Sequence, residues 1–503
     1  MKILILLLLS LFNSALAQQD CSPLEGYGSI SKKMLQQRVE ILSADSLDGR
    51  ATGTEGQWKA ARFIASVFKQ CNLLPLGDSG TYFQQFSLEE KNKFDTSSIV
   101  LYNKIHSKKY FVGKDFTVSD PIPCSITAPV VFVGELNDNL SLTLPDTLCN
   151  DIAIVIAQES FLMHFSNLAS ITESIQRFIG RKVRAVIVFP SQDNDLYKSY
   201  LAETMKNKKQ KLSFPSTDSQ LSLPVIYATS SMAKEILQNS KISYKNLEQH
   251  FQLSSHPLFI DDLQLSIFQY PTITSIRTCN VVGLLPGNDS SKNMETIVFS
   301  AHHDHLGRIN STAYYPGADD NGSGSAILLE LVQAFSKISH SLKRNILFLS
   351  FTGEENGLLG STYFVSHSPV PLSNIVTIFN IDMVGRKDYN HITSNYIYII
   401  GANRTSKRLD SLLQATNDRT IHFQLDYRYN DEQYPTSLFW RSDHYPFVQH
   451  GIPAIFFFGG FHGDYHSPFD TKEKLLYDKM VSLTQLLFCL GWSVQQLELP
   501  LLP

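Results

Sequence analysis

The sequence has no excess of charge of either sign. Its 43 Lys and Arg residues nearly balance 47 Asp and Glu residues, and the formal net charge of −4 is small for 503 residues. Proteins that bind nucleic acid or anionic membranes through charge usually carry a marked basic excess. The composition therefore favours neither partner, and we expect no nucleic acid to bind.

Long apolar segments are also absent beyond the first few residues. Residues 3–9 form an unbroken apolar run between the basic start Met1-Lys2 and the small-x-small sequence Ala15-Leu16-Ala17. This run is too short for a membrane anchor, which needs about 20 apolar residues. The pattern is typical of a signal peptide, residues 1–17, cleaved after Ala17. We expect a secreted or periplasmic protein with no stable membrane insertion after cleavage.

Cysteine is scarce, and no C-x-x-C spacing occurs among the six cysteines. A zinc site built from cysteines is therefore not expected. An even number in an exported chain permits disulfides, but the sequence does not select a pairing. Cys71 and Cys489 lie in apolar, helix-like stretches, which favours a buried free thiol at each position.

The remaining sequence divides into three regions, residues 18–94, 95–260 and 261–503. The first is helical in pattern, with Ser29 or Ser31 as a candidate cap and a Gly- and Asp-containing loop at 47–53. The second carries short β-rich runs at 99–102, 130–133, 152–156, 185–189 and 223–227, and we interpret it as an inserted module.

In the third region strands and helices alternate, which predicts an α/β fold with a mostly parallel central sheet flanked by helices. The predicted strands are residues 296–300, 346–351, 376–381 and 454–458. Open sheets of this kind bind ligands beyond the carboxyl ends of their strands. The residues that follow these strands are therefore the candidates for a functional site.

Each of these strands is followed by His, Glu or Asp, and a Gly-rich turn before a helix adds another Asp. The candidates are His302, Asp320, Glu354, Glu355, Asp382 and His466. Each has a simpler explanation alone, such as a turn, a helix cap or a solvated surface. Adjacent half-buried carboxylates repel each other, and a nearby positive charge is needed to offset this repulsion. The set as a whole indicates a two-metal hydrolase site.

The motifs AHHDHLG, GADDNGSG, FTGEEN, NIDMVGR and DYHSPFDT, taken in this order, resemble the secreted di-zinc aminopeptidase family. The wider relatives of that family include glutamate carboxypeptidases and glutaminyl cyclases. The earlier stretch LDGRATGTEG also resembles the family's opening segment. Residues 95–260 are similar in position and strand texture to the protease-associated domain that members of the family often carry as an insertion.

The resemblance implies a role for each matching residue. His302 and Asp382 would bind one zinc, Glu355 and His466 would bind a second, and Asp320 would bridge the two. Asp304 would orient His302 from behind. Glu354 would be the general base, and Tyr465 would donate a hydrogen bond to the developing oxyanion.

The other polar residues of these motifs have weaker claims to the site. At most one of His303 and His305 is expected near the metals, and a structural role is favoured for both and for His444. His462 is interpreted as part of a loop, and Asp319 as a solvent-facing residue or a turn stabiliser. Phe461 and Phe469 suit either an apolar pocket or the core.

The chemistry suits zinc, which takes imidazole nitrogen and carboxylate oxygen, although cobalt or manganese also fits such donors. We expect two Zn²⁺ per chain and an exported aminopeptidase acting on peptides. Three alternatives remain: a carboxypeptidase, a glutaminyl cyclase on the same scaffold, or a non-catalytic receptor. The preferred side chain and the oligomeric state are not readable from the sequence.

Overall fold

The structure is a computed structural model, and it describes most of the chain after residue 20. The described residues are 21–501 without 23, 93–96, 104–106, 137–147, 149–150, 164–167, 180–182, 192–193, 207–211, 216–222, 241, 254–255, 293, 432–437 and 499–500. The predicted signal peptide lies outside them. No helix within the described part has both the length and the apolar character needed to cross a bilayer.

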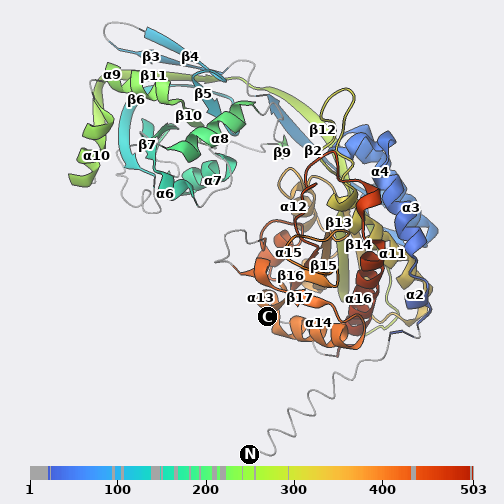
Figure 1. The fold of residues 1–503 in the computed structure, drawn as a ribbon. Helices are drawn as coiled ribbons and strands as arrows, with labels where there is room; N and C mark the ends of the chain where they lie inside the picture. Colours follow the sequence, from blue (N-terminus) through green and yellow to red (C-terminus); the bar gives the residue numbers. More distant parts are fainter. Residues whose placement is uncertain are drawn as a thin grey trace, which may run out of the picture. The chain divides into compact units, whose positions relative to one another are not determined.

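The chain forms two compact units (Figure 1). Unit 1 contains residues up to Ser87 and from Arg277 onward, and unit 2 contains Leu88 to Ile276. The sequence placed the limits of its inserted module at 95 and 260. Strands β2 (Phe83–Asn92) and β12 (Thr272–Leu285) each include residues of both units, so the chain enters and leaves unit 2 along strands.

Unit 1 is an α/β fold around a mixed sheet in the order β17-β16-β18-β15-β13-β14-β12-β2. Its centre is four parallel strands, β18, β15, β13 and β14, as the alternation of strands and helices predicted. Strand β12 runs antiparallel to β14, and β16 antiparallel to β18. The four central strands are β13 (Thr296–His302), β14 (Asn345–Phe351), β15 (Ile375–Asp382) and β18 (Ala454–Phe458).

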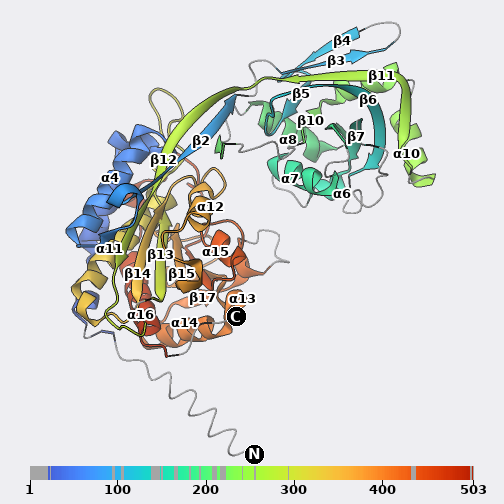
Figure 2. The same ribbon diagram turned by 180° about the vertical axis from the view of Figure 1, so that it is seen from behind.

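Helices cover both faces of this sheet, which is why the central strands are apolar on both sides. On one face Phe299, Phe348 and Phe379 pack with α3, α4, α11 and α16 in the largest core. On the other face Val298 and Leu347 pack with α12 and α15. Figure 1 shows α3, α4, α11 and α16 gathered on the same side of unit 1, and Figure 2 shows α4, α11 and α16 there from behind.

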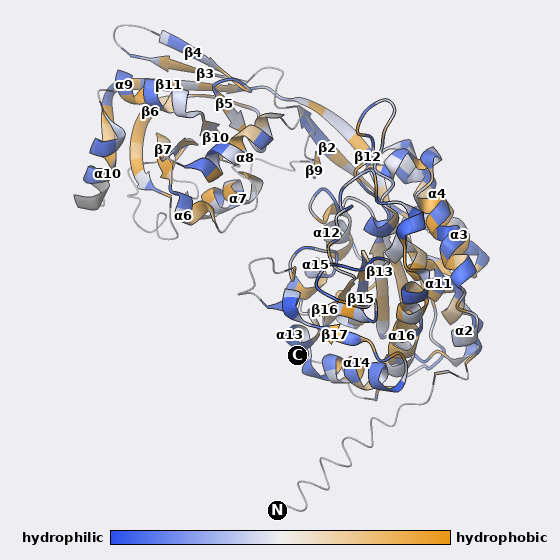
Figure 3. Ribbon diagram, in the orientation of Figure 1, coloured by the Kyte–Doolittle hydropathy of each residue, from blue (hydrophilic) through white to orange (hydrophobic). Residues whose placement is uncertain are grey.

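Two helices of unit 1, α3 and α4, begin at residues whose side chains cap them. Ser31 and Thr54 accept hydrogen bonds from backbone N–H groups at the starts of α3 and α4, and Ser31 was one of the two predicted caps. Both helices carry hydrophobic and hydrophilic residues side by side (Figure 3). The helices are α2 (Glu25–Gly28), α3 (Lys32–Leu42), α4 (Glu55–Gln70), α11 (Gly324–Lys337), α12 (Leu359–Ser366), α13 (Ala402–Thr405), α14 (Lys407–Arg419), α15 (Tyr445–Gln449) and α16 (Tyr477–Gln495). The remaining strands are β1 (Leu74–Pro75), β16 (Tyr396–Ile400) and β17 (Gln424–Asp426).

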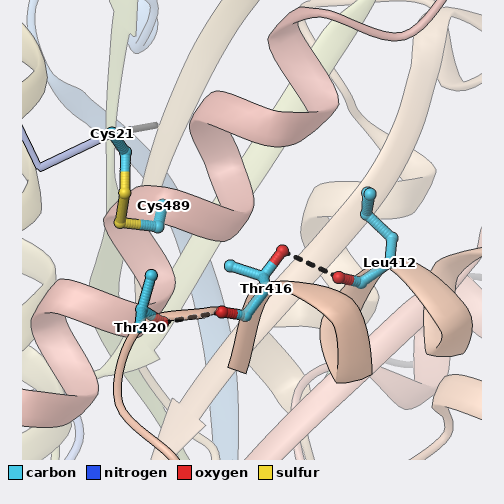
Figure 4. Close-up of a disulfide and its surroundings, with 5 residues drawn as sticks. All are labelled: Cys21, Leu412, Thr416, Thr420 and Cys489. Atoms are coloured by element: carbon cyan, nitrogen blue, oxygen red, sulfur yellow. Dashed lines mark hydrogen bonds between the residues drawn. A yellow bond between two sulfur atoms is a disulfide. The ribbon is translucent and has the colours of Figure 1, made fainter. Parts of the chain in front are cut away.

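Cys489 is not a free thiol, contrary to the sequence expectation. It forms a disulfide with Cys21 that joins the N-terminal segment to α16, beside α14 (Figure 4). The apolar helical stretch around Cys489 does predict burial, but a buried sulfur can equally be half of a disulfide. Cys71, Cys124 and Cys279 are free thiols; Cys71 is free as expected, but it is half-buried and not buried.

Unit 2 has its own sheet, in the order β4-β3-β11-β6-β7-β8-β10-β5, with parallel pairing from β6 through β7 and β8 to β10. The five predicted strands are present within it, and separate apolar cores lie on its two faces. Its strands are β3 (Ser98–Tyr102), β4 (Ser107–Phe111), β5 (Phe116–Val118), β6 (Cys124–Glu135), β7 (Ile152–Ala157), β8 (Ala185–Pro190), β9 (Leu212–Ser213), β10 (Val225–Ala228) and β11 (Leu258–Gln269). Its helices are α6 (Glu159–Leu162), α7 (Leu168–Ile179), α8 (Asp195–Lys206), α9 (Ser230–Asn239) and α10 (Tyr244–Leu253).

Candidate metal centre

The five predicted ligands lie together at the carboxyl edge of the unit 1 sheet. His302 and Asp382 are the last residues of β13 and β15, and Glu355 follows β14. Asp320 lies in the turn before α11, and His466 follows β18. Parallel strands place their carboxyl ends at one edge, so residues far apart in the sequence meet there.

The ligand atoms form two groups that share Asp320. In the first group, Nε2 of His302 lies 3.2 Å from Oδ1 of Asp382 and 3.5 Å from Oδ1 of Asp320. In the second, Nε2 of His466 lies 3.2 Å from Oδ2 of Asp320 and 3.3 Å from Oε2 of Glu355. The two oxygens of Asp320 thus face different histidines, an arrangement that would suit a carboxylate shared by two cations.

Glu354 belongs to the first group by position. Its Oε2 lies 3.9 Å from Nε2 of His302, and His302, Glu354 and Asp382 all offer donor atoms within 4.8 Å of one another. Glu355, its neighbour, faces the second group. Burial raises the pKa of Glu354 well above its usual value, and the nearby carboxylates of Asp382 and Glu355 add to that rise.

His305 lies in the second group, although the sequence favoured a structural role for it. Its Nδ1 is 2.6 Å from Oε1 of Glu355 and 3.9 Å from Oδ2 of Asp320, and these three residues form a second cluster of donors. His303 turns away into the core, where its ring contacts Gln57 and Ser350. The expectation that at most one of the two lies near the site is therefore met by His305.

The four carboxylates of the site outnumber its three histidines, so its negative charge calls for positive charge nearby. Burial lowers the pKa of His302. The neighbouring carboxylates of Asp382 and Glu354 raise it by more than burial lowers it, so the pKa lies well above its usual value. For His466 the neighbouring Asp320 and Glu355 outweigh burial and raise the pKa to about 10. Imidazole nitrogens and carboxylate oxygens are zinc donors, and a divalent cation would displace the protons of these histidines. The donor set therefore fits a pair of divalent cations.

Several residues outside the donor groups hydrogen-bond to the donor side chains and hold them in place. Nδ1 of His302 lies 3.3 Å from the backbone carbonyl of Asp304 and 3.7 Å from its carboxylate, so Asp304 lies where the sequence expected it. Ser442 donates to Oδ2 of Asp382 at 2.8 Å, and Asn380 donates in turn to Ser442. The sequence did not single out Ser442 or Asn380 for this position, although Ser442 adjoins the noted His444.

Two buried aspartates secure the turn that carries Asp320. Oδ2 of Asp470 accepts the backbone N–H groups of Asp319 and Asp320 at 2.9 and 3.1 Å. Asp319 is fully buried, so the solvent-facing alternative is wrong and the turn-stabilising one holds. Its carboxylate accepts the N–H of Gly385 at 2.6 Å and lies 3.2 Å from His462, which is a partner of this turn as well as a loop residue.

A small pocket that is open to solvent lies beside the donors. Its walls combine the acidic donors with an apolar side formed by Met383, Leu438, Phe456, Phe458 and Phe461. Tyr465 lines it too, with its ring stacked on His466 at 3.8 Å. Phe461 is thus a pocket residue, whereas Phe469 is 65% exposed and is not among the lining residues. His444 is fully buried and packs against Phe456.

This combination of fold and site defines a class. An α/β sheet with paired nitrogen and oxygen donors at its carboxyl edge, beside a pocket, is the arrangement of a metal-dependent hydrolase. Residues 280–489 match the model of Peptidase family M28. All the candidate donors lie within the matched segment.

Curated relatives with similar sequences are peptidases. The chain is 26% identical over 214 residues to aminopeptidase YwaD of Bacillus subtilis, which covers 41% of this chain and 42% of the relative. It is 30% identical over 216 residues to a probable leucine aminopeptidase of Arthroderma otae, covering 41% and 55%. The chain thus spans about half the length of the curated relatives it matches.

The fold of a larger part of the chain is also known from a solved structure. An aminopeptidase from Aneurinibacillus sp. strain AM-1 superposes with a TM-score of 0.55 and 19% identity, covering 95% of this chain and 97% of that one. At this identity the likeness concerns the fold, and it agrees with the α/β architecture predicted from the sequence.

Proposed function

We propose that the chain is an exported aminopeptidase that holds two zinc ions and removes N-terminal residues from peptides. The observation that carries this proposal is the position of Asp320, whose two carboxylate oxygens face His302 and His466 at 3.5 and 3.2 Å. His302 and Asp382 would hold one ion, Glu355 and His466 the other, and Asp320 both. The curated relatives of similar sequence are aminopeptidases, which supports this assignment.

Bound zinc supplies Lewis-acid chemistry, which acidifies water and polarises a carbonyl group. The chain's own residues move the protons. Glu354 stands beside the first group of donors without being needed as a ligand, so its carboxylate takes a proton from the attacking water. It then delivers that proton to the nitrogen of the leaving amine as the peptide bond breaks.

Tyr465 would assist by donating a hydrogen bond to the developing oxyanion. Its side chain lines the pocket beside His466. Burial raises the pKa of Tyr465 above its usual value, so the hydroxyl keeps its proton and can donate to a developing oxyanion. Asp304 and Ser442 orient His302 and Asp382 and do not touch the substrate.

Export and the insertion belong to the same proposal. The Cys21–Cys489 disulfide is of the kind that persists in oxidising compartments, which supports a secreted or periplasmic location. We propose that unit 2 is the protease-associated-like insertion, because it has a separate sheet and separate cores between two segments of unit 1.

The deciding experiment is a substrate panel with metal analysis on the same sample. Aminoacyl-anilides and free dipeptides should be cleaved, N-blocked peptides should resist, and the chain should carry two zinc ions. Cleavage of N-blocked peptides from the other end would instead identify a carboxypeptidase, and cyclisation of an N-terminal glutamine would identify a cyclase. A metal-loaded chain that turns over none of them would favour a binding protein.

A further inference from the structure

The loop at residues 49–52 lies far outside the segment that matches the peptidase family, which begins at residue 280. It nevertheless reaches the metal centre. Its contacts go to three different loops, and each of those loops carries predicted ligands. The most extensive of them come from Arg50, whose side chain is 1% exposed.

Arg50 binds the turn that carries Asp320. Its Nη1 donates to the carbonyl of Pro316 at 2.5 Å, and its Nη2 donates to the carbonyls of Gly317 and Asp320 at 2.7 and 3.1 Å. Nη1 also donates to the carbonyl of Leu42 at 3.0 Å. One planar guanidinium therefore fixes four backbone carbonyls, and three of them belong to this turn.

The second and third loops are reached by Thr52 and by the backbone. The hydroxyl of Thr52 donates to Oδ2 of Asp304 at 2.7 Å and accepts from Nδ2 of Asn356 at 3.0 Å, next to Glu355. The backbone of the loop pairs with the segment after His302, where His305 N–H donates to the carbonyl of Arg50 at 3.1 Å. The loop at residues 49–52 therefore holds the three ligand-bearing loops in fixed positions relative to one another.

The backbone of this loop is held in an uncommon conformation. Arg50 has φ of 43°, in the left-handed region that non-glycine residues rarely occupy. Gly49 has φ of 69°, and a Cβ there would come within 2.4 Å of the Gly307 carbonyl oxygen. Such strain persists where the surroundings fix it, and it is common at functional sites. The buried guanidinium also brings a positive charge toward Asp320, Asp304 and Glu355.

We propose that Arg50 is a positioning residue of the metal centre: it sets the place of Asp320 between the two ion sites, and Thr52 supports it by fixing Asp304. The proposal rests on the proposed two-metal function. The hydrogen bonds of the Arg50 guanidinium go to backbone carbonyls and not to the carboxylate of Asp320. Its effect passes through the turn at 316–320, so it must show in metal affinity and ligand geometry.

The test compares Arg50→Lys with a matched control, Arg344→Lys. Arg344 is also buried, and it donates to three backbone carbonyls, those of Val494, Gln495 and Leu497, and to the carboxylate of Glu295. It lies just before β14, at the opposite end of that strand from Glu354. The control therefore measures what the loss of a buried guanidinium does to stability alone.

Zinc retention is measured on the full chain against a series of chelator concentrations, with the cobalt-substituted absorption spectrum and the thermal midpoint beside it. Arg50→Lys should lose metal at chelator concentrations about 10–100-fold lower than the wild type, with an altered cobalt spectrum. Arg344→Lys should lower the thermal midpoint while it keeps wild-type retention and spectrum. Equal retention and spectra in both variants would overturn the proposal.

Thr52→Val keeps the test decisive if Arg50→Lys does not fold, because it removes a single hydroxyl. It should weaken metal retention and alter the cobalt spectrum, and wild-type behaviour in both would then overturn the proposal. A wild-type chain that binds no zinc would overturn the two-metal function itself. A wild-type chain that binds zinc, with unaffected variants, would overturn only the role of the loop.

Discussion

At the scale of single residues, the adjacent glutamates Glu354 and Glu355 face different partners. Glu355 approaches His305 and His466, whereas Glu354 approaches His302. Successive residues that leave a strand diverge, so neighbours in the sequence can take separate tasks. The two proposed tasks, ligand and base, can be separated by experiment because loss of each has a different signature.

Glu354→Gln should keep the zinc content of the wild type and lower kcat by about 10²–10⁴-fold, since an amide cannot accept the proton. Glu355→Gln should instead lose zinc, because it removes an anionic donor from the second group. Zinc analysis and kcat on the same preparations separate the two. Full turnover in a zinc-replete Glu354→Gln chain would exclude Glu354 as the base.

Tyr465→Phe should lower kcat by about 10²–10³-fold and leave KM and zinc content near the wild-type values, because the hydroxyl acts only on the developing oxyanion. The ring remains, so its stacking on His466 is preserved. Steady-state kinetics on an aminoacyl-anilide measure the effect. If KM rises while kcat holds, Tyr465 binds the ground state and does not serve the oxyanion.

The sequence predicted the donors better than it predicted the residues behind them. His302, Asp320, Glu355, Asp382 and His466 follow strands or open a helix, and their residue types reveal them. The residues that hold the donors act through backbone groups or through another side chain; they are Ser442, Asp470 and Arg50. Such contacts produce no recognisable spacing pattern in the sequence. His305 was ambiguous because the run His302 to His305 cannot show which side chain faces the sheet edge.

At the scale of elements, the strands were predictable because apolar runs that are covered on both faces stand out from their surroundings. How helices pack against each other was not predictable, and the junction of α3 with α11 shows why. Arg38 on α3 forms a buried ion pair with Glu330 on α11, and the two side chains are 4% and 1% exposed. Neither residue carries any local signal that its partner lies about 290 positions away.

Arg38→Met should lower the free energy of unfolding by about 3–5 kcal/mol, because it leaves the Glu330 carboxylate buried without its cation. Burial already raises the pKa of Glu330 even in the presence of Arg38. The double variant Arg38→Met/Glu330→Met should recover most of the loss, since no unpaired charge remains. Urea unfolding measures all three chains.

The exposed pair Arg62–Glu55 on α4 is the matched control, with side chains 50% and 68% exposed. Arg62→Met should cost no more than about 1 kcal/mol, because water screens both charges. An Arg38→Met chain as stable as Arg62→Met would show that the Glu330 carboxylate is neutral or solvated in the folded protein.

At the scale of the whole molecule, both ends of the described chain belong to unit 1, and unit 2 is inserted between them. The sequence indicated this order through the change in texture between 95 and 260, because an inserted module has its own alternation of strands. It did not indicate what joins the two ends. The Cys21–Cys489 disulfide spans 468 positions, so no local pattern relates the two cysteines.

The last prediction concerns that disulfide. Cys21→Ser should lower the free energy of unfolding by about 2–5 kcal/mol, because the bond restricts a very long loop in the unfolded chain. Thermal or denaturant unfolding is compared with and without reductant. Reductant should destabilise the wild type and leave Cys21→Ser unchanged, since the other cysteines within the described residues, Cys71, Cys124 and Cys279, are free thiols. The zinc content and kcat of Cys21→Ser should match the wild type under conditions where the chain is folded, because the bond lies on α16 and not at the sheet edge. If reductant left the wild type as stable as before, the bond would not contribute to stability, and its support for an oxidising compartment would be lost.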